Sequence, residues 1–306
     1  MKNTIKTAVF RSYIKGSARL AWLGKVAKHI TSLDLVAEQE QRRIPLRLYL
    51  PPGDGPFPVV VYFHGGGWVI GDLATYDPMC RDLCDRSDTI VVAVDYRRAP
   101  EYPFPAAPED CLTALTWVAE HIGLYGGRAD SIVLAGDSAG GNLAAVTAIQ
   151  ARDQLPGLVK GQVLIYPVTD HYEPGTDSYI ENAKGPVLTR PIMMWFWDSY
   201  LANSSALKAG EHRHPLATPL TADDLSMLPP ALVITAERDP LRDEGIAYAC
   251  RLEEQGVAVT QSLYHGASHG FIGLQGPTRR HKEGMMEICA WLAALFGRQA
   301  EPPIEV

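Results

Sequence analysis

The chain has 306 residues, of which 46% are hydrophobic and 21% charged, a composition typical of a soluble globular enzyme. Its formal net charge is −7, which argues against a nucleic-acid partner, because binding to a phosphate backbone needs clustered lysine and arginine. No apolar run approaches the roughly 18 residues that a membrane span needs, so no membrane partner is expected. No apolar signal-peptide stretch follows the basic N-terminus, and this pattern predicts a cytoplasmic protein.

The five cysteines are odd in number and scattered along the chain, so neither a disulfide framework nor a zinc site is expected. His212 and His214 lie close together in the sequence, but no cysteine or carboxylate stands near them at ligand spacing. The sequence therefore predicts no metal site.

In chain order, residues 1 to about 42 read as helix and loop, and the hydrophobic period then changes. The alternating stretch at 45–51 predicts a half-buried strand, and short apolar runs rich in Val and Ile predict strands at 57–65, 89–96, 131–137, 161–167 and 230–237. A last strand is expected near 258–264. Helical stretches separate them at about 74–86, 108–122, 139–152 and 242–255, with a last helix near 278–296. Unbroken apolar strands that alternate with helices predict an α/β fold with a mostly parallel central sheet flanked by helices.

One segment interrupts this alternation and reads as a longer helical insertion. Gly185–Leu201 brings two methionines, two tryptophans and a phenylalanine together at 193–197. Together with the N-terminal stretch, the insertion can form a cap over one end of the sheet. We therefore expect N-terminal cap helices over 1–45 and one catalytic domain over 46–306, with the cap insertion at about 185–210.

The segment Gly136–Gly140 has the form G-x-S-x-G between a predicted strand and a predicted helix. Glycines two residues before and two after Ser138 let neighbouring chains approach without a Cβ clash. The turn leaves the serine hydroxyl above the carboxyl edge of the sheet, facing the N–H groups and the positive dipole end of the helix. This context favours a nucleophile over a plain turn.

A serine hydroxyl needs a base, and the base needs an orienting acid, in the chain order serine, acid, histidine for this architecture. Asp239 follows a predicted strand and precedes a proline, which disfavours helix at Asp239 and suits a fixed loop. Its rivals as the acid are Glu237, Asp243 and Glu244. For the base, His269 and His265 both lie just after the last predicted strand, and spacing alone leaves the two open.

A tetrahedral intermediate also needs hydrogen-bond donors for its oxyanion. The stretch HGGGW at 64–68 follows a predicted strand, and its consecutive glycines can turn successive N–H groups toward one point. In a chain that also carries G-x-S-x-G, this stretch reads as an oxyanion loop. The N–H of Ala139, the residue after the serine, is a further donor.

Taken together, these residues resemble the hormone-sensitive-lipase-like family of α/β-hydrolases, the bacterial type IV carboxylesterases. The resemblance runs from about residue 45 to the end, in the blocks HGGGW (64–68), DYRRAPEYPFPAAPED (95–110), GDSAGGNLA (136–144), LPPALVITAERDPLRDEG (228–245) and HGF (269–271). It implies the α/β-hydrolase fold with a helical cap. It also implies these roles: nucleophile Ser138, acid Asp239, base His269, and oxyanion donors Gly66, Gly67 and Ala139.

The form GDSAG points to the subgroup of this family with Asp before the serine. Two residues depart from the family pattern. Arg98 stands where the family usually has Leu, and His214 stands where Ser is common before the proline. Neither departure touches the expected triad, but both can alter local packing or the cap edge.

The expected activity is hydrolysis of short- to medium-chain acyl esters through an acyl-enzyme, without metal or cofactor. The aromatic insertion predicts an apolar pocket for a small apolar ester, with Trp68, Met193 and Trp197 as candidate pocket residues. Two alternatives remain: a small-ligand receptor without turnover, and a hydrolase of amide, lactone or carbamate bonds. The family often pairs as dimers, so a homodimer is possible, although no feature of the sequence fixes an interface.

Overall fold

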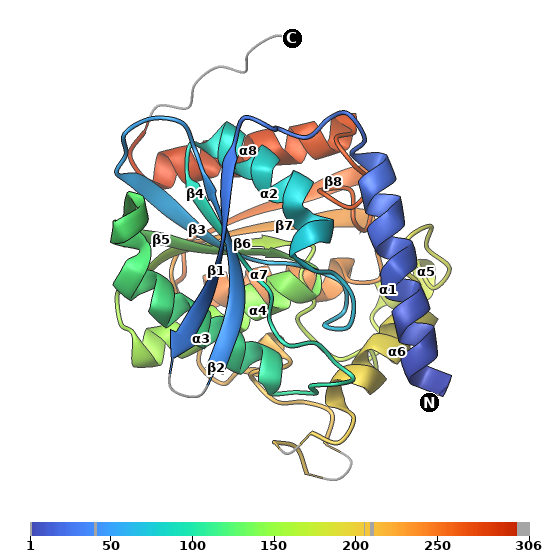
Figure 1. Cartoon of the computed structure of the whole chain (residues 1–306). Helices are drawn as coiled ribbons and strands as arrows, with labels where there is room; N and C mark the ends of the chain where they lie inside the picture. Colours follow the sequence, from blue (N-terminus) through green and yellow to red (C-terminus); the bar gives the residue numbers. More distant parts are fainter. Residues whose placement is uncertain (1, 40–41, 205, 209–210, 299–306) are drawn as a thin grey trace.

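An eight-stranded sheet crosses the molecule, and helices cover both of its faces (Figure 1). The computed structural model describes residues 2–39, 42–204, 206–208 and 211–298. The strands are β1 (Thr31–Gln39), β2 (Arg42–Leu50), β3 (Phe57–Phe63), β4 (Ile90–Val94), β5 (Gly127–Asp137), β6 (Val159–Ile165), β7 (Ala231–Arg238) and β8 (Val259–Ser268). Their order is β1-β2-β4-β3-β5-β6-β7-β8, in which β3 to β8 are parallel and β1 and β2 are antiparallel to their neighbours.

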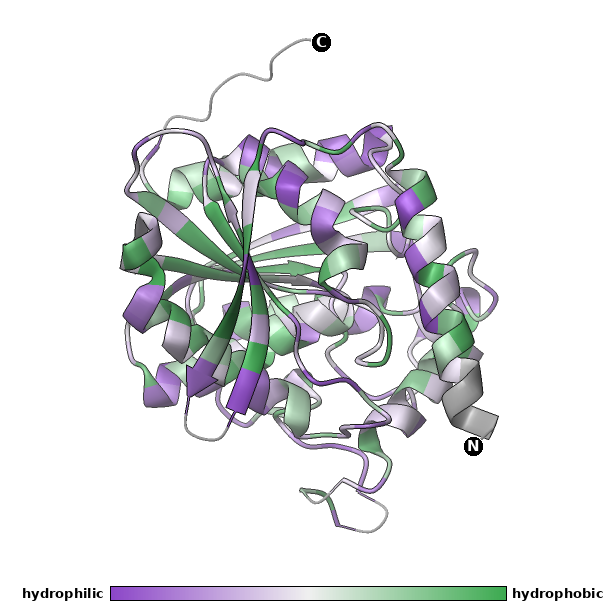
Figure 2. Ribbon diagram, viewed as in Figure 1, coloured by the Kyte–Doolittle hydropathy of each residue, from purple (hydrophilic) through white to green (hydrophobic). Residues whose placement is uncertain are grey.

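Each face of the sheet carries its own hydrophobic core. Side chains of β3 alternate between the two, so that Val59 and Val61 pack on one face while Val60 and Tyr62 pack on the other. A strand buried on both faces needs apolar residues at every position, which explains the unbroken runs in the sequence. Figure 2 shows these parallel strands hydrophobic along their length, whereas the outer helices alternate between hydrophilic and hydrophobic residues.

The helices divide between the two faces. Among the helices that flank the sheet, α3 (Ala106–His121), α4 (Ala139–Gln154) and α7 (Arg242–Glu254) have sides buried in the Val59 core. The Val60 core is covered by α2 (Leu73–Ser87) and α8 (Arg279–Leu295). The short elements η1 (Ile122–Tyr125) and η2 (Pro219–Thr221) belong to connections. The predicted strands and helices of this central unit are all present, with ends displaced by a few residues.

Two helices lie together at the edge of the molecule, α1 (Lys2–Ala21) and α6 (Arg190–Leu201), and the short helix α5 (Asp177–Glu181) precedes α6 in the chain (Figure 1). Phe10 of α1 meets Trp195 of α6 edge to face, with ring centroids 5.8 Å apart. Just after α1, the indole N–H of Trp22 donates to the carbonyl of Gly273 at 2.8 Å. The first helix is therefore attached to both the insertion and the C-terminal part of the chain.

The expectation for the N-terminal 45 residues is wrong in part. Thr31–Gln39 is strand β1 rather than helix or loop, and it pairs with β2, which begins at Arg42. The helical part of this region therefore ends at Ala21. An edge strand with one partner buries little, and Leu33 and Val36 are more than a third exposed, so no continuous apolar run marks it in the sequence.

In the insertion expected at 185–210, the helix is α6, and residues 205, 209 and 210 lie outside the described residues. No helix in the described part of the chain combines the length and the apolar character needed to cross a bilayer.

Candidate active site

Ser138 sits alone in the turn between β5, which ends at Asp137, and α4, which begins at Ala139. Its φ of 55° and ψ of −120° are unusual for a residue with a side chain, a strain of about 1–3 kcal/mol. Hydrogen bonds hold the turn in place, because Ser138 N donates to the carbonyl of Ile165 at 2.8 Å and Asn142 N donates to the carbonyl of Ser138 at 3.0 Å. The strain is therefore held by the surrounding structure at one residue.

The two flanking glycines are required by close backbone contacts. A Cβ on Gly136 would lie 2.3 Å from the carbonyl oxygen of Gly140, and a Cβ on Gly140 would lie 1.9 Å from the carbonyl oxygen of Phe63. No side-chain movement can relieve these contacts, since the opposing atoms are backbone. The glycines thus let β3, β5 and α4 meet closely enough to form the sharp turn.

The structure brings Ser138, His269 and Asp239 together from three parallel strand ends. Asp239 directly follows β7, and His269 directly follows β8. His269 Nε2 lies 3.0 Å from Ser138 Oγ, and His269 Nδ1 lies 2.6 Å from Asp239 Oδ2. All three residues are buried, and the second carboxylate oxygen of Asp239 accepts the N–H of Leu241 at 3.0 Å. This arrangement can pass a proton between a hydroxyl and an oriented imidazole.

The rival residues do not meet His269 or Ser138. His265 is 77% exposed at its side chain, and its Nδ1 lies 3.5 Å from Oε1 of Glu237, so these two rivals pair with each other on the surface. Asp243 instead accepts the N–H of Ser178 at 2.7 Å, and the buried Glu244 accepts the N–H of Thr169 at 2.8 Å.

The segment 64–72 after β3, named here the triglycine loop, lies against the serine. Gly65, Gly66 and Gly67 line the same cavity as Ser138 and His269. The φ of Gly66 is 111° and that of Gly67 is 58°. The N–H groups of Gly66 and Gly67 have no acceptor among the described residues, and Ala139 begins α4, where helical N–H groups lack intrahelical partners. These three donors can therefore serve one bound oxygen.

His64 bonds to the peptide group that joins Gly65 and Gly66. Its Nδ1 lies 2.8 Å from the carbonyl of Gly65, and only a protonated nitrogen can donate to a carbonyl. Because C=O and N–H point in opposite directions in a planar trans peptide, this bond directs the N–H of Gly66 the other way. Burial, together with the nearby Arg98 charge, lowers the pKa of His64 to about 4, so that the imidazole is neutral near pH 7.

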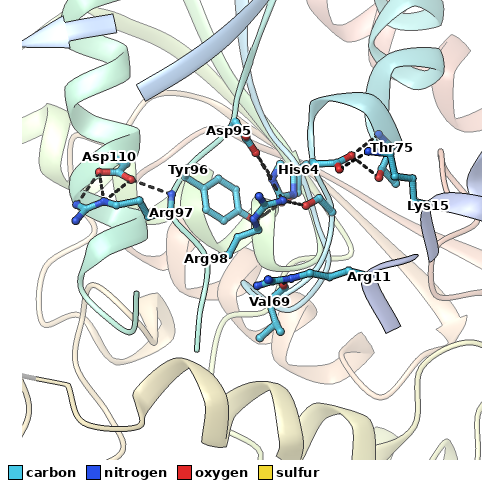
Figure 3. Close-up of polar contacts among 12 residues, drawn as sticks. Arg11, Lys15, His64, Val69, Thr75, Asp95, Tyr96, Arg97, Arg98 and Asp110 are labelled. Atoms are coloured by element: carbon cyan, nitrogen blue, oxygen red, sulfur yellow. Dashed lines mark hydrogen bonds and ion pairs between the residues drawn. The ribbon is translucent and has the colours of Figure 1, made fainter. Parts of the chain in front are cut away.

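The departure Arg98 also acts on this loop. Its guanidinium donates to the carbonyl of Gly71 and lies 3.7 Å from Asp95 Oδ1 (Figure 3). Tyr96, between these two residues in the sequence, stacks on His64 with centroids 4.4 Å apart and donates to the carbonyl of His64 at 2.7 Å. Residues 95–98 thus support the triglycine loop from the outside.

Asp137 joins the serine turn to the triglycine loop, a role that sequence reasoning missed. Its Oδ1 accepts the hydroxyl of Tyr62 at 2.7 Å and the N–H of Gly65 at 2.9 Å, and its Oδ2 accepts the hydroxyl of Tyr76 at 2.9 Å. Burial raises the pKa of this carboxyl above its ordinary value, although the three donors favour the charged form. The aspartate of G-D-S-A-G was the available signal, but its partners depend on strand register.

The cavity that contains Ser138 has a largely apolar wall, to which α1 and α6 contribute. It is open to solvent at its mouth. Apolar side chains that line it include Phe10 and Ile14 of α1, Ile192 and Phe196 of α6, and Leu274. An apolar group attached to an ester carbonyl can be held there.

The three residues expected to line this pocket do not line it, and this corrects the prediction from sequence. Trp68, Met193 and Trp197 are buried in the hydrophobic core instead. Ile192 and Phe196 face the cavity. The residue after each of them, Met193 and Trp197, is rotated by about 100° around the helix axis and faces the core. Trp68 stacks on Tyr200 with ring centroids 4.2 Å apart.

Comparisons with known proteins match the fold of this chain. A protein-family model described as the alpha/beta hydrolase fold matches residues 60–273. Carboxylic ester hydrolase LipN of Mycobacterium tuberculosis is 41% identical over 252 residues, which cover 80% of this chain and 65% of LipN, just under two thirds of its length. Carboxylesterase NlhH of the same organism is 44% identical over 232 residues, 75% of this chain and 71% of NlhH. A solved esterase of Pyrobaculum calidifontis is similar with a TM-score of 0.89 and 40% identity, over 95% of this chain and 93% of that one.

Proposed function

The chain belongs to the hormone-sensitive-lipase-like carboxylesterases of the α/β-hydrolase fold, and from this premise we propose that it hydrolyses short- to medium-chain acyl esters through an acyl-enzyme on Ser138. The observation that carries the proposal is the continuous run of contacts from Ser138 Oγ through His269 to Asp239, at 3.0 Å and 2.6 Å. The GDSAG subgroup is part of the proposal and is supported by residues 136–140.

The first half of the reaction forms the acyl-enzyme. His269 Nε2 takes the proton of Ser138 Oγ while the oxygen attacks the ester carbonyl carbon. Asp239 accepts the Nδ1–H of His269, which sets the tautomer and stabilises the imidazolium that forms. When the tetrahedral intermediate collapses, the C–O bond to the alcohol breaks and His269 returns the proton to the departing alkoxide oxygen.

The N–H groups of Gly66, Gly67 and Ala139 bind the oxyanion of both tetrahedral intermediates. Such donors act mostly on the transition state, and losing one costs about 3–4 kcal/mol of barrier in a well-studied protease. Buried Asp137 accepts the N–H of Gly65 and so keeps the triglycine loop in position against Ser138.

The second half of the reaction clears the acyl group. Water enters the position that the alcohol has left, and His269 takes one of its protons as its oxygen attacks the acyl carbon. The C–O bond to Ser138 then breaks, the serine regains a proton from His269, and the acid leaves. Every step uses protein groups and water, so the proposal involves no metal and no cofactor.

The apolar wall supports an acyl chain rather than a charged group as the bound part of the substrate. Phe10 and Ile14 come from α1, and Ile192 and Phe196 come from α6, so two separate segments close over the serine. We assign these segments to the cap, and the sheet with its flanking helices to the catalytic domain. A cytoplasmic location, a homodimer, and the lack of nucleic-acid and membrane partners also belong to this proposal.

The first experiment is a rate series on p-nitrophenyl acetate, butyrate, octanoate and palmitate, with wild type beside Ser138→Ala. We expect the highest kcat/KM at acetate to octanoate and a loss of at least about a thousandfold in the variant. Ser226→Ala, on the loop before β7 at the other end of the sheet, is the control and keeps the wild-type rate. If Ser138→Ala keeps its rate, the site assignment is wrong.

The same assay separates the alternatives. A wild-type rate no greater than background on every ester, together with ligand binding, favours the receptor. Faster turnover of a matched p-nitroanilide, lactone or carbamate favours the corresponding hydrolase. The position of His269 against Ser138 supports turnover over simple binding, since binding alone does not need a base on the serine.

A further inference from the structure

Arg11 of α1 reaches across to the triglycine loop. Its Nε donates to the carbonyl of Val69 at 2.8 Å, and its Nη2 donates to the carbonyl of Ala99 at 3.1 Å. The same guanidinium forms a bidentate pair with Glu101, at 2.9 Å and 2.8 Å (Figure 3 shows Arg11 beside Val69). Two backbone carbonyls from different loops therefore share one side chain of the N-terminal helix.

The carbonyl of Val69 lies two peptide groups from a proposed oxyanion donor. It shares a peptide plane with the N–H of Ile70, which donates to the carbonyl of Gly66 at 2.9 Å. The carbonyl of Gly66 in turn shares a plane with the N–H of Gly67, at the cavity. Because each planar trans peptide directs its N–H opposite to its C=O, the orientation set at Val69 passes along this relay to Gly67.

The second bond of Arg11 supports a parallel branch of the relay. The N–H of Ala99 donates to the carbonyl of Trp68 at 2.9 Å, and the N–H of Val69 donates to the carbonyl of Gly66 at 3.1 Å. The carbonyl of Gly66 thus accepts the N–H groups of Ile70 and Val69, and the carbonyl of each of these two peptide groups is bonded from outside the loop. The first of these carbonyls, that of Val69, accepts from Arg11 directly. The second, that of Trp68, accepts from the N–H of Ala99, and Arg11 donates to the carbonyl of Ala99.

We propose that Arg11 is a positioning residue for the oxyanion donor Gly67, so that docking of α1 also completes the oxyanion hole. The inference rests on the oxyanion role proposed above for Gly67. On the same helix, Phe10 and Ile14 line the cavity on either side of Arg11 in the sequence. One helix therefore supplies both a wall for the acyl chain and the bond that aims a transition-state donor.

The chain offers a matched control for simple attachment of the helix. Lys15, one turn further along α1, forms a contact of 2.9 Å with Asp72 Oδ2, but it bonds a side chain rather than a loop carbonyl. Glu101→Gln is a second control, since it weakens the exposed ion pair and leaves both carbonyl bonds of Arg11. If Arg11 only attaches α1, then Arg11→Met and Lys15→Met act alike.

The test measures kcat, KM and the affinity for an acyl trifluoromethyl ketone, which forms a tetrahedral adduct with the serine. For Arg11→Met we expect kcat to fall about tenfold with KM within about twofold, because oxyanion donors act on the transition state. Affinity for the ketone falls by the same factor as kcat/KM. Arg11→Lys, which can still reach one carbonyl, recovers part of the loss, while Lys15→Met and Glu101→Gln stay within about twofold of wild type.

A second readout does not depend on Arg11→Met folding normally. In protein labelled with ¹⁵N-glycine, the Gly67 amide resonance shifts in Arg11→Lys and stays in place in Lys15→Met. An unmoved Gly67 resonance, or equal losses of kcat in Arg11→Met and Lys15→Met, overturns the inference.

Ser138→Ala is run in parallel to separate the two proposals. If Ser138→Ala is inactive while Arg11→Met has wild-type kcat and ketone affinity, only the role of Arg11 is wrong. If Ser138→Ala is active, the proposed site itself is wrong and the role of Arg11 is overturned with it.

Discussion

The hydroxyl of Tyr76, from the first turns of α2, donates to Asp137 Oδ2 at 2.9 Å, immediately before the strained Ser138. Tyr62 and the N–H of Gly65 bind the other oxygen of the same carboxylate. A helix, two strand ends and the triglycine loop therefore meet on one buried side chain. Its hydrogen bonds should matter both to folding and to the geometry of the reaction.

Tyr76→Phe leaves one oxygen of this buried carboxylate without its donor. We expect the free energy of unfolding to fall by about 1–3 kcal/mol, the usual cost of an unsatisfied buried polar group. We also expect kcat/KM to fall several-fold, because the loop is held less firmly. Tyr264→Phe is the control, since its hydroxyl donates to Glu287 at 2.6 Å and both residues are only partly buried, so that water can replace the bond. Equal unfolding curves for Tyr76→Phe and wild type, by urea denaturation, contradict the prediction.

Gly67→Ala places a Cβ about where the Phe196 ring already lies, with its Cγ only 2.1 Å away. We expect a loss of kcat/KM of about a hundredfold, because the loop must move away from the serine. Gly157→Ala is the control for the backbone strain that an alanine brings at a positive φ. Gly157 has a similarly positive φ of 77° but open space around it, so this substitution should lower stability by about 1 kcal/mol and leave the activity unchanged. In Gly67→Ala/Phe196→Ala, the clash is removed and the thermal midpoint should rise above that of the single Gly67→Ala variant.

Phe196 and Trp197 are neighbours on α6 with different expected roles. Phe196→Leu enlarges the cavity, and the ratio of kcat/KM for octanoate to that for acetate should rise. Trp197→Leu removes a buried ring that faces the core, so it should cost about 2–4 kcal/mol of stability and leave the ratio unchanged. A chain-length preference that shifts in Trp197→Leu and stays fixed in Phe196→Leu would restore the pocket predicted from sequence.

His171 predicts one part of the pH dependence of stability. Burial lowers its pKa from 6.5 to about 4, against the opposing charge of Glu173. The unfolded chain takes up a proton near pH 6.5 and the folded chain does so only near pH 4. The contribution of His171 to the free energy of unfolding is therefore complete above about pH 6.5. It is lost as pH falls toward 4, at up to about 1.4 kcal/mol per pH unit.

Urea unfolding of wild type and His171→Gln at pH 7, 6 and 5 isolates this contribution from carboxyls that titrate in the same range. The difference in unfolding free energy between the two proteins should change in favour of the variant as pH falls. His29→Gln, on the surface, is the matched control. A difference that stays constant from pH 7 to pH 5 contradicts the prediction.

The central sheet was predictable because its strands are buried on both faces, as the alternation of Val59 and Val60 between two cores shows. The edge strand β1 was not, since half-exposed residues such as Leu33 and Val36 leave no apolar run. Ser138, Asp239 and a histidine could be placed together because parallel strands deliver their carboxyl ends to one edge of the sheet, whereas the choice of His269 over His265 came from the family resemblance.

The pocket wall was less predictable for a geometrical reason. Hydrophobic spacing finds the helix α6, but it does not say which apolar residue faces a cavity and which faces the core. One step along the helix exchanges Phe196 for Trp197, and both are large and apolar. The partners of Asp137 were out of reach for a related reason, because the meeting of Tyr62 with Asp137 depends on the register of β3 against β5.

The bond from Trp22 to Gly273 joins residues 251 positions apart in the chain. At a synthesis rate of about 5–20 residues per second, the ribosome makes the first helix and then takes roughly 13–50 s to make its partner. Throughout that interval Trp22, just after α1, lacks its C-terminal partner, whereas Phe10 on the helix waits only for Trp195 of α6. The contacts of this helix therefore become available at different times during synthesis: those with Val69 and Ala99 first, the one with Trp195 later, and the one from Trp22 to Gly273 last.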